Sequence, residues 1–250
     1  MKRDIFLISN STNAGEQYLG WIKNDIVAYC RQRNIKEALF VPYAGVNVGQ
    51  AFDGKKINDS YDLYFDRVKN VFESDGLTLL STHKCDSPIE KYVEKAECII
   101  VGGGNTFHLV YELHRLNLMD CIRKRILEGC PYIGWSAGAN IACPTMKTTN
   151  DMPVVEPKSF DTLGVVPFQI NPHYLDANPE GHGGETREDR IREFLTVNPS
   201  VTVAGLREAT ALIVKDDDIK LIGSRSLRVF RYGVEPQEFS LKDDLKFLLE

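Results

Sequence analysis

The sequence has no long hydrophobic run, no C-x-x-C motif and no excess of basic residues, and each absence excludes a class of protein. No apolar stretch approaches the ~20 residues that a membrane-spanning helix needs, and the one at the N-terminus is too short for a signal peptide. The 30 Lys and Arg residues are outnumbered by 35 Asp and Glu, and a net charge of −5 argues against general nucleic-acid binding. We therefore expect a cytoplasmic protein that binds neither membranes nor nucleic acids.

The cysteines and the chain composition exclude further classes. The 6 cysteines form no close cluster with histidine, so we expect ordinary buried thiols, no metal site and no cofactor. There is also no Pro-, Gly- or Ser-rich linker and no low-complexity segment. At 250 residues, a single α/β hydrolytic domain over residues 1–250 is the simplest organisation, and it could act as a monomer or a homodimer.

Short apolar runs alternate with amphipathic helical patterns through the first half of the chain. Strands are predicted at residues 5–8, 38–41, 77–80, 98–101 and 132–135, and helices at 16–33, 61–72, 88–96, 107–113 and 118–127. This alternation predicts a mainly parallel sheet covered by helices on both faces. Functional groups are then expected at the carboxyl ends of the strands.

The second half has a different pattern. Loops are predicted at residues 144–167 and 179–186, with a strand at 169–174 between them and a helix at 187–197 after them. Short strands are predicted at 201–204, 211–214, 219–222 and 227–230. Three aspartates at 216–218 indicate a hairpin turn between two of these strands. We therefore expect a small antiparallel β appendix beside the parallel core.

Residues 134–138 read Gly-Trp-Ser-Ala-Gly and fit the G-x-S-x-G pattern of a nucleophile elbow. A serine at a sharp strand-to-helix turn has strained backbone angles, and its hydroxyl points out of the sheet. The flanking glycines let the two backbones pass, and the N–H of Ala137 can bind an oxyanion. Ser136 is therefore a candidate nucleophile, and the alternative is a tight turn with a buried serine.

A serine nucleophile needs a base, and the base needs an orienting acid. His173 lies at a strand end, where its side chain can be fixed, and we favour it over His182, which lies among glycines. Asp151, Asp176 and Glu208 are all candidates for the acid, and the residues alone do not rank them.

A glycine run at 102–104 follows a predicted strand and precedes a predicted helix. It lacks both G-x-G-x-x-G and a P-loop lysine, so a phosphate site is the weaker interpretation. Gly103 and Gly104 fit better as a second wall of an oxyanion hole, opposite the N–H of Ala137.

Arg187 lies in the first turn of a predicted helix, where a cation opposes the helix dipole. Such a residue beside a helix N-terminus could bind a carboxylate in two parallel hydrogen bonds. The alternative is an exposed arginine paired with Glu185 or Glu188.

Several blocks of the sequence resemble the signature blocks of the peptidase E family, the cytosolic α-aspartyl dipeptidases. They follow the order of the family: residues 102–107 (GGGNTF), 134–140 (GWSAGAN), 148–153 (TTNDMP), 169–173 (QINPH) and 180–187 (EGHGGETR). The agreement is far more specific than the elbow alone, and it covers roughly residues 100–210.

The resemblance implies a fold like that of class I glutamine amidotransferases, with serine in place of the usual cysteine. It implies a Ser-His-Glu triad of Ser136, His173 and Glu208, which selects one of the three acids left open above. It also assigns Arg187 to the aspartate side chain of the substrate.

Two further positions, Asn105 and Asp151, fall in the family's blocks, and we assign them to substrate binding, with the role of Asp151 left open. The resemblance implies hydrolysis of small peptides with an α-linked N-terminal aspartate (Asp-Xaa). The alternatives are a cyanophycinase-like β-aspartyl exopeptidase and a ligand-binding relative without catalytic activity.

Overall fold

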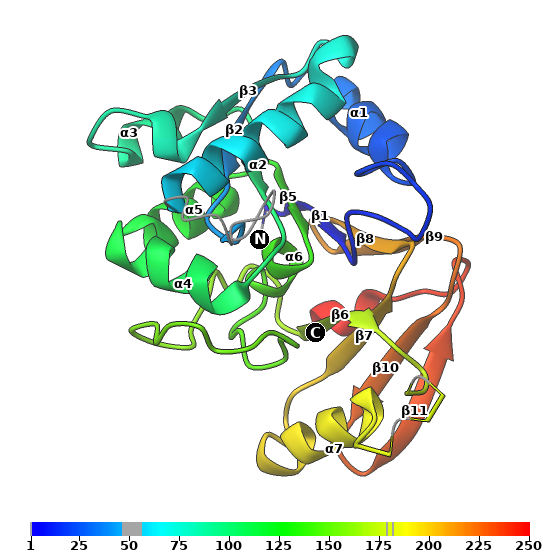
Figure 1. The fold of residues 1–250 in the computed structure, drawn as a ribbon. Helices are drawn as coiled ribbons and strands as arrows, with labels where there is room; N and C mark the ends of the chain where they lie inside the picture. The colour runs from blue at the N-terminus through cyan, green and yellow to red at the C-terminus, as the bar shows by residue number, and fades with distance from the viewer. Residues whose placement is uncertain (1, 47–56, 179, 182) are drawn as a thin grey trace.

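The computed structural model describes residues 2–46, 57–178, 180–181 and 183–250, and its strands form two sheets (Figure 1). In spatial order, the larger sheet holds β3 (Thr78–Ser81), β2 (Glu37–Val41), β4 (Ile99–Val101), β5 (Tyr132–Trp135), β1 (Asp4–Ile8), β8 (Thr210–Lys215) and β9 (Asp218–Gly223). The smaller sheet holds β11 (Val234–Phe239), β10 (Leu227–Arg231), β7 (Val203–Arg207) and β6 (Gln169–Tyr174).

The helices connect these strands. They are α1 (Lys23–Gln32), α2 (Ile57–Phe72), α3 (Glu90–Lys95), α4 (Thr106–Arg115), α5 (Leu118–Leu127), α6 (Ala137–Asn140) and α7 (Arg187–Val197), with short 3₁₀ turns at Glu73–Asp75, Thr82–Lys84 and Lys246–Leu249. None of the helices in the described part of the chain combines the length and the apolar character that crossing a membrane requires.

The larger sheet is parallel from β3 to β1, and β8 and β9 extend it in antiparallel pairing. Alternate residues of the buried strand β1 face opposite layers, because side chains in a strand alternate between its two faces. Phe6 and Ile8 pack in the cluster that includes α1 and α2, whereas Ile5 and Leu7 pack in the cluster that includes α4 and α5. The predicted parallel core with helices on both faces is confirmed.

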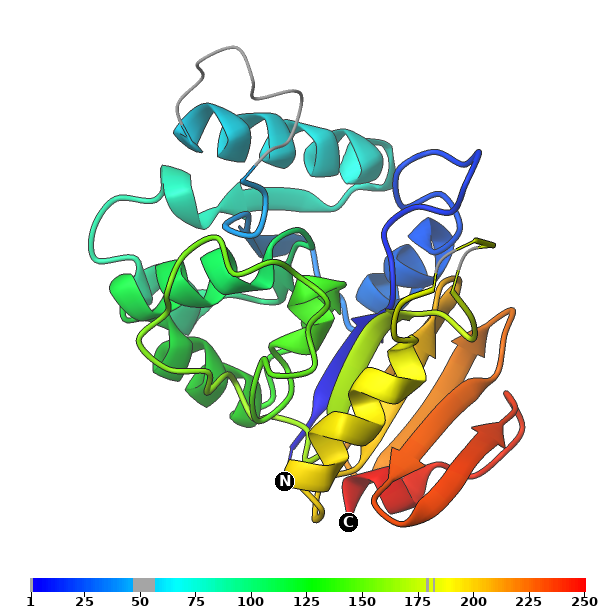
Figure 2. The same cartoon turned by 60° about the horizontal axis from the view of Figure 1, so that its bottom comes forward.

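The smaller sheet is antiparallel apart from the β6–β7 pair, which is parallel. One of its faces joins the core of the larger sheet through residues such as Ile170 and Leu206. Its other face is covered by α7, where Ile191 and Leu195 pack against Phe230. Figure 2 shows α7 lying across this sheet. The predicted β appendix is confirmed, with the refinement that β8 and β9 belong to the larger sheet.

Some predicted boundaries were wrong. The helix predicted at 16–33 begins only at Lys23, because Leu19 has a left-handed backbone (φ 58°) that no helix continues through. The strand predicted at 201–204 is β7, which runs from Val203 to Arg207. Strand β11 was not predicted, because it is a mostly exposed edge strand that contains Pro236. The predicted hairpin turn is present, since Lys215 pairs with Asp218 across it.

Candidate active site

Ser136 lies at the junction of β5 and α6, at the carboxyl edge of the larger sheet. Its backbone has φ 53° and ψ −113°, a sparsely populated conformation for a residue with a side chain. The Ser136 N–H donates to the carbonyl of Ile8 at the end of β1, over 3.0 Å. The strained backbone agrees with the elbow pattern, and the neighbouring strand β1 holds the turn in place.

The two flanking glycines make this sharp turn possible. A Cβ on Gly138 would collide with the carbonyl of Val101 in β4, and a Cβ on Gly134 would collide with the carbonyl of Gly138. Only glycine permits both approaches. The helix after the turn is shorter than the pattern suggested, since α6 has only 4 residues. Any oxyanion contact there depends on the local N–H of Ala137 rather than on a long helix dipole.

His173 lies next to Ser136 although it comes from the smaller sheet. Its Nε2 is 2.9 Å from Ser136 Oγ, and its Nδ1 is 2.8 Å from Glu208 Oε1. His173 lies at a register shift between Pro172 and Tyr174 in β6 and has a left-handed φ of 53°. Glu208 directly follows β7, which is the strand paired with β6. Serine, imidazole and carboxylate therefore form one hydrogen-bonded chain.

The other candidate acids contact different partners. Asp176 accepts hydrogen bonds from the guanidinium of Arg207. Oδ2 of Asp151 accepts from both the N–H and the hydroxyl of Thr106, over 2.7 and 2.6 Å. His182, the alternative base, lies outside the described residues. In the described structure the acid in contact with His173 is Glu208.

The glycine run lies against the elbow. Gly103 is so close to Ser136 that a Cβ on it would collide with the serine Cβ. The carbonyl of Gly103 accepts a hydrogen bond from the buried Tyr64 hydroxyl over 2.9 Å. Because a peptide unit is planar and trans, the N–H of Gly104 points to the opposite side of that peptide. Gly103, Gly104 and Ala137 stay predicted oxyanion donors, and this geometry is compatible with that role.

Tyr64 lies within the helix predicted at residues 61–72 and was given no role of its own. Its hydroxyl also accepts from Trp135 Nε1 over 3.0 Å and lies 3.2 Å from the hydroxyl of Tyr18. Burial raises the pKa of the Tyr64 hydroxyl, so this group stays protonated and can donate to Gly103. Tyrosines recurring at helical spacing gave no signal that one of them would support the glycine run.

Asn105 and Asp151 fix the long loop to the start of α4. Asn105 is the N-cap of α4, where its Oδ1 accepts from His108 N over 3.0 Å while its Nδ2 donates to Met152 O over 2.9 Å. Asp151 binds the first residue of the same helix, Thr106, as described above. Both side chains therefore order the loop, and their assignment to substrate binding stays a prediction.

Arg187 is the first residue of α7, as predicted. The helix begins with a capping box, in which Thr186 Oγ1 accepts from Asp189 N over 3.1 Å and Asp189 Oδ2 accepts from Thr186 N over 2.9 Å. The alternative partners of Arg187 are engaged elsewhere. Glu185 pairs with Arg190, while Glu188 pairs with two other arginines of the smaller-sheet region. Among the residues that the structure describes, Arg187 has no ion pair.

A cavity of about 160 Å³ lies beside Arg187. It is lined by Lys147, Thr148, Thr149, Asn150, Asp151, Asn171, Arg187, Arg190, Ile191 and Phe194. Burial and the neighbouring Arg190 lower the pKa of Arg187, whereas the charge of Asp151 acts in the opposite direction. Asn171 precedes His173 by two residues on β6, so the same strand lines the cavity and carries the imidazole. The arrangement offers a half-buried cation to a small anionic group.

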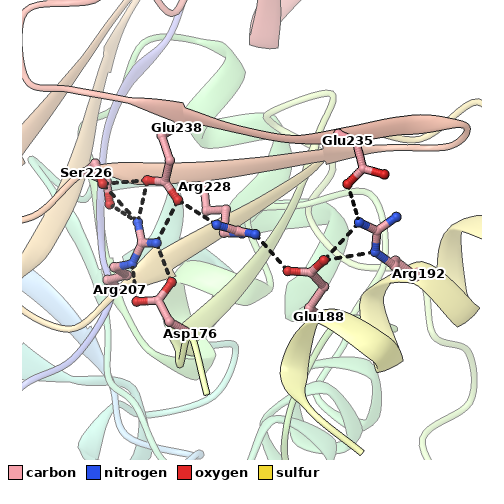
Figure 3. A network of polar contacts seen from close by, with 8 residues as sticks. All are labelled: Asp176, Glu188, Arg192, Arg207, Ser226, Arg228, Glu235 and Glu238. Carbon is pink, nitrogen blue, oxygen red and sulfur yellow. Dashed lines mark hydrogen bonds and ion pairs between the residues drawn. The ribbon is translucent and has the colours of Figure 1, made fainter. Parts of the chain in front are cut away.

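A chain of alternating charges connects α7 to the smaller sheet (Figure 3). Arg207 lies between Asp176 and Glu238, and Arg228 lies between Glu238 and Glu188. Arg207 directly precedes Glu208, while Glu188 directly follows Arg187. The network therefore braces both the turn that carries Glu208 and the helix start that carries Arg187.

In the described ranges, no three His, Cys, Asp or Glu side chains are arranged to hold a metal ion. The cysteines are unpaired: Cys30, Cys98, Cys130 and Cys143 are buried and the other two are half-buried. Burial raises the pKa of Cys143 to about 12, and the other buried thiols shift in the same direction. These thiols are protonated core residues, as the sequence predicted.

Solved structures with a similar fold support the architecture. A structure from Listeria monocytogenes EGD-e aligns with a TM-score of 0.61 over 90% of this chain and 100% of that chain, at 21% identity. A peptidase from an acI-B1 Actinobacterium aligns with a TM-score of 0.64 over 98% and 97% of the two chains, at 14% identity. At these identities the likeness concerns the fold alone.

Sequence relatives identify the family. The model of peptidase family S51 matches residues 5–222. A peptidase E from Nostoc sp. (strain PCC 7120) is 44% identical over 250 residues, which is 100% of this chain and 98% of the relative. A peptidase E from Salmonella arizonae is 43% identical over 233 residues, 93% of this chain and 95% of the relative. The resemblance noted in the sequence is confirmed: the chain belongs to peptidase family S51 and is a peptidase.

Proposed function

We propose that this peptidase is a serine dipeptidase that hydrolyses Asp-Xaa dipeptides with a Ser136-His173-Glu208 triad. The observation that supports the proposal most is the hydrogen-bonded chain from Ser136 Oγ through His173 to Glu208, with contacts of 2.9 and 2.8 Å. The 2.9 Å from Ser136 Oγ to His173 Nε2 is within the range in which a base can take a proton from a nucleophile, and the 2.8 Å from Nδ1 to Glu208 is a hydrogen bond that can orient the base. The name of the relatives, peptidase E, agrees with this class of reaction.

The reaction follows from the positions of these groups. Ser136 Oγ attacks the carbonyl carbon of the peptide bond while His173 Nε2 takes its proton. Glu208 holds the imidazole through Nδ1 and stabilises the imidazolium. The N–H groups of Ala137 and Gly104 bind the oxyanion of the tetrahedral intermediate. His173 then protonates the leaving amine as the C–N bond breaks, which leaves an acyl-enzyme on Ser136. Water attacks this ester as His173 takes its proton, and His173 returns the proton to Ser136 Oγ as the aspartate product leaves.

Substrate selection rests on Arg187. Its half-buried guanidinium lines a cavity of about 160 Å³, small beside the ~300–1,000 Å³ of typical ligand pockets. An aspartyl carboxylate there gains a bidentate partner in a partly desolvated site. Lys147 and Arg190 line the same cavity, and this excess of three cations over the one carboxylate of Asp151 disfavours the basic β-aspartyl-arginine units of a cyanophycinase-like substrate.

A dipeptide panel tests this function. We expect rapid hydrolysis of Asp-Leu, little of Glu-Leu, and none of β-Asp-Leu or N-acetyl-Asp-Leu, with rates unchanged by EDTA. Leucine release is measured by chromatography, and purified Ser136→Ala is the control. Preference for β-Asp-Leu would favour the exopeptidase alternative, and no turnover of any peptide would favour a ligand-binding relative.

A further inference from the structure

The segments that carry the three triad residues all bond to one end of β1. Ile8 accepts from the N–H of Ser136, and the next two residues, Ser9 and Asn10, contact the segments that carry His173 and Glu208. We propose that Ser9 and Asn10 are positioning residues that keep the base and the acid aligned with the nucleophile. This proposal rests on the proposed function.

Ser9 connects β6 and β7 of the smaller sheet at the catalytic end. Its side chain is fully buried (0% exposed). The hydroxyl accepts from the N–H of His173 over 3.0 Å and donates to the carbonyl of Leu206 in β7 over 2.7 Å. Figure 2 shows the end of β1 (blue) beside β6 (yellow-green). The Ser9 hydroxyl, directly after β1, is therefore hydrogen-bonded to both β6 and β7 and links the two sheets.

The bond from Ser9 holds a residue that the β6–β7 register skips. His173 has a φ of 53° and lies at the register shift of the β6–β7 pair. A left-handed backbone outside glycine persists only where its surroundings hold it. Ser9 supplies such a contact at the N–H of the very residue whose ring must meet both Ser136 and Glu208.

Asn10 holds the turn that carries the acid. Its side chain is buried (1% exposed), and its Oδ1 accepts from the N–H of Ala209 over 2.9 Å. Ala209 directly follows Glu208 and also has a left-handed backbone (φ 59°). Asn10 itself is anchored, because its Nδ2 donates to Thr12 O and to Asn13 Oδ1 over 3.0 and 2.8 Å. The peptide that joins Glu208 to Ala209 is thereby fixed.

Neither side chain reaches the reacting atoms through these contacts, so their loss should impair catalysis through the geometry of His173 and Glu208. Displacements on the order of 1 Å in a reacting constellation cost about 10²-fold. We expect Ser9→Ala to lower kcat for Asp-Leu by about 10- to 100-fold, with KM within about twofold of wild type.

Matched variants separate positioning from general loss of structure. Ser81 is the control, because it is another fully buried serine (0% exposed) at a strand end of the larger sheet, where its Oγ bonds to His83 Nδ1 over 2.7 Å and contacts Phe40 O over 3.4 Å. Ser81→Ala should lower the melting temperature as Ser9→Ala does but leave kcat within about twofold. Ser9→Thr keeps the hydroxyl and should recover most of the activity.

The experiment measures kcat and KM, the melting temperature, and the labelling rate of Ser136 by a fluorophosphonate probe. If Ser9→Ala does not fold, Asn10→Ala is compared with Asn13→Ala, which removes a local partner of Asn10 but not the bond to Ala209. Slower labelling of Ser136 in the Ser9→Ala or Asn10→Ala variant, together with a lower kcat at nearly unchanged KM, supports the proposal. A Ser9→Ala or Asn10→Ala enzyme with wild-type kcat and labelling overturns it while the triad stands. Absence of labelling in the wild type overturns the proposed function, and this proposal with it.

Discussion

The two sheets contribute different parts of the candidate site and are stabilised in different ways. The larger sheet supplies Ser136 and the glycine run, held by backbone bonds and by an apolar core on both faces. The smaller sheet supplies His173 and Glu208, and the helix on its outer face supplies Arg187. The smaller sheet shares the larger sheet's core on one face, has only a small apolar cluster against α7 on the other, and adds the charge network around Arg207.

The difference indicates which parts of the site respond to conditions. Apolar burial changes little with pH or salt, whereas exposed and half-buried ion pairs weaken when salt screens them or when a carboxylate is protonated. We therefore expect the nucleophile turn to be the robust part of the site. The base, the acid and the arginine should depend more on single polar contacts.

The largest effect within the smaller sheet is expected at Glu208. Glu208→Gln should lower kcat by about 10³-fold with little change in KM, because an amide favours the wrong histidine tautomer. Asp151→Asn keeps an acceptor oxygen for Thr106 and should cost less than about 10-fold. Steady-state kinetics on Asp-Leu measure both. An inactive Asp151→Asn beside an active Glu208→Gln would show that the acid has been misassigned.

Arg187 should have the next largest effect. Arg187→Ala should lose about 10²-fold in kcat/KM on Asp-Leu, about 3 kcal/mol, because the aspartyl carboxylate loses its charge partner. Arg187→Lys should recover only part, since lysine lacks the guanidinium fork. Arg190→Ala is the matched control: it removes a cation from the same cavity and helix, but one that already pairs with Glu185. Equal losses in the two alanine variants would refute a specific role for Arg187.

The smallest effect is expected on stability. Hydrogen bonds from Arg207 lower the pKa of Glu238 to about 2, so its stabilising contribution is present above pH ~4.5 and is lost as the pH falls toward 2. Because the side chain is 42% exposed, screening leaves about 1 kcal/mol of this contribution. Between pH 6 and pH 3, wild type should lose about 1 kcal/mol more unfolding free energy than Glu238→Gln.

Urea titrations at the two pH values measure this difference. Glu235→Gln is the control, because Glu235 is 89% exposed and pairs only at the edge of the network with Arg192. It should follow the wild type at both pH values. An identical pH response in wild type and Glu238→Gln would mean that the network contributes nothing to stability.

The two sheets also differ in how far the sequence predicted them. In the parallel part of the larger sheet, each strand is a short apolar run followed by a turn signal, so these strands, their parallel direction and the position of Ser136 could be inferred from local patterns, whereas β8 and β9 were expected in the appendix. The G-x-S-x-G spacing predicted that only glycine would fit beside the serine. The structure agrees, because a Cβ at Gly134 or Gly138 would collide with a backbone carbonyl.

The smaller sheet depends on contacts between residues far apart in the chain, which local patterns do not contain. The choice of Glu208 over Asp151 rested on family resemblance, because nothing in the spacing showed that β7 would end beside His173. The left-handed backbone of His173, the bond from Ser9 and the edge strand β11 likewise follow from tertiary packing. Arg187 stood out because it broke a helix-start preference, but its cavity could not be foreseen.

The central claim is that a nucleophile from the larger sheet is activated by a base from the smaller one. Labelling with a fluorophosphonate, followed by intact-mass measurement and peptide mapping, tests it most directly. We predict one adduct per chain on the peptide that contains Ser136, none in Ser136→Ala, and labelling slowed by at least about 10²-fold in His173→Ala. An adduct on another residue, or labelling of Ser136 at the wild-type rate without His173, would contradict the claim.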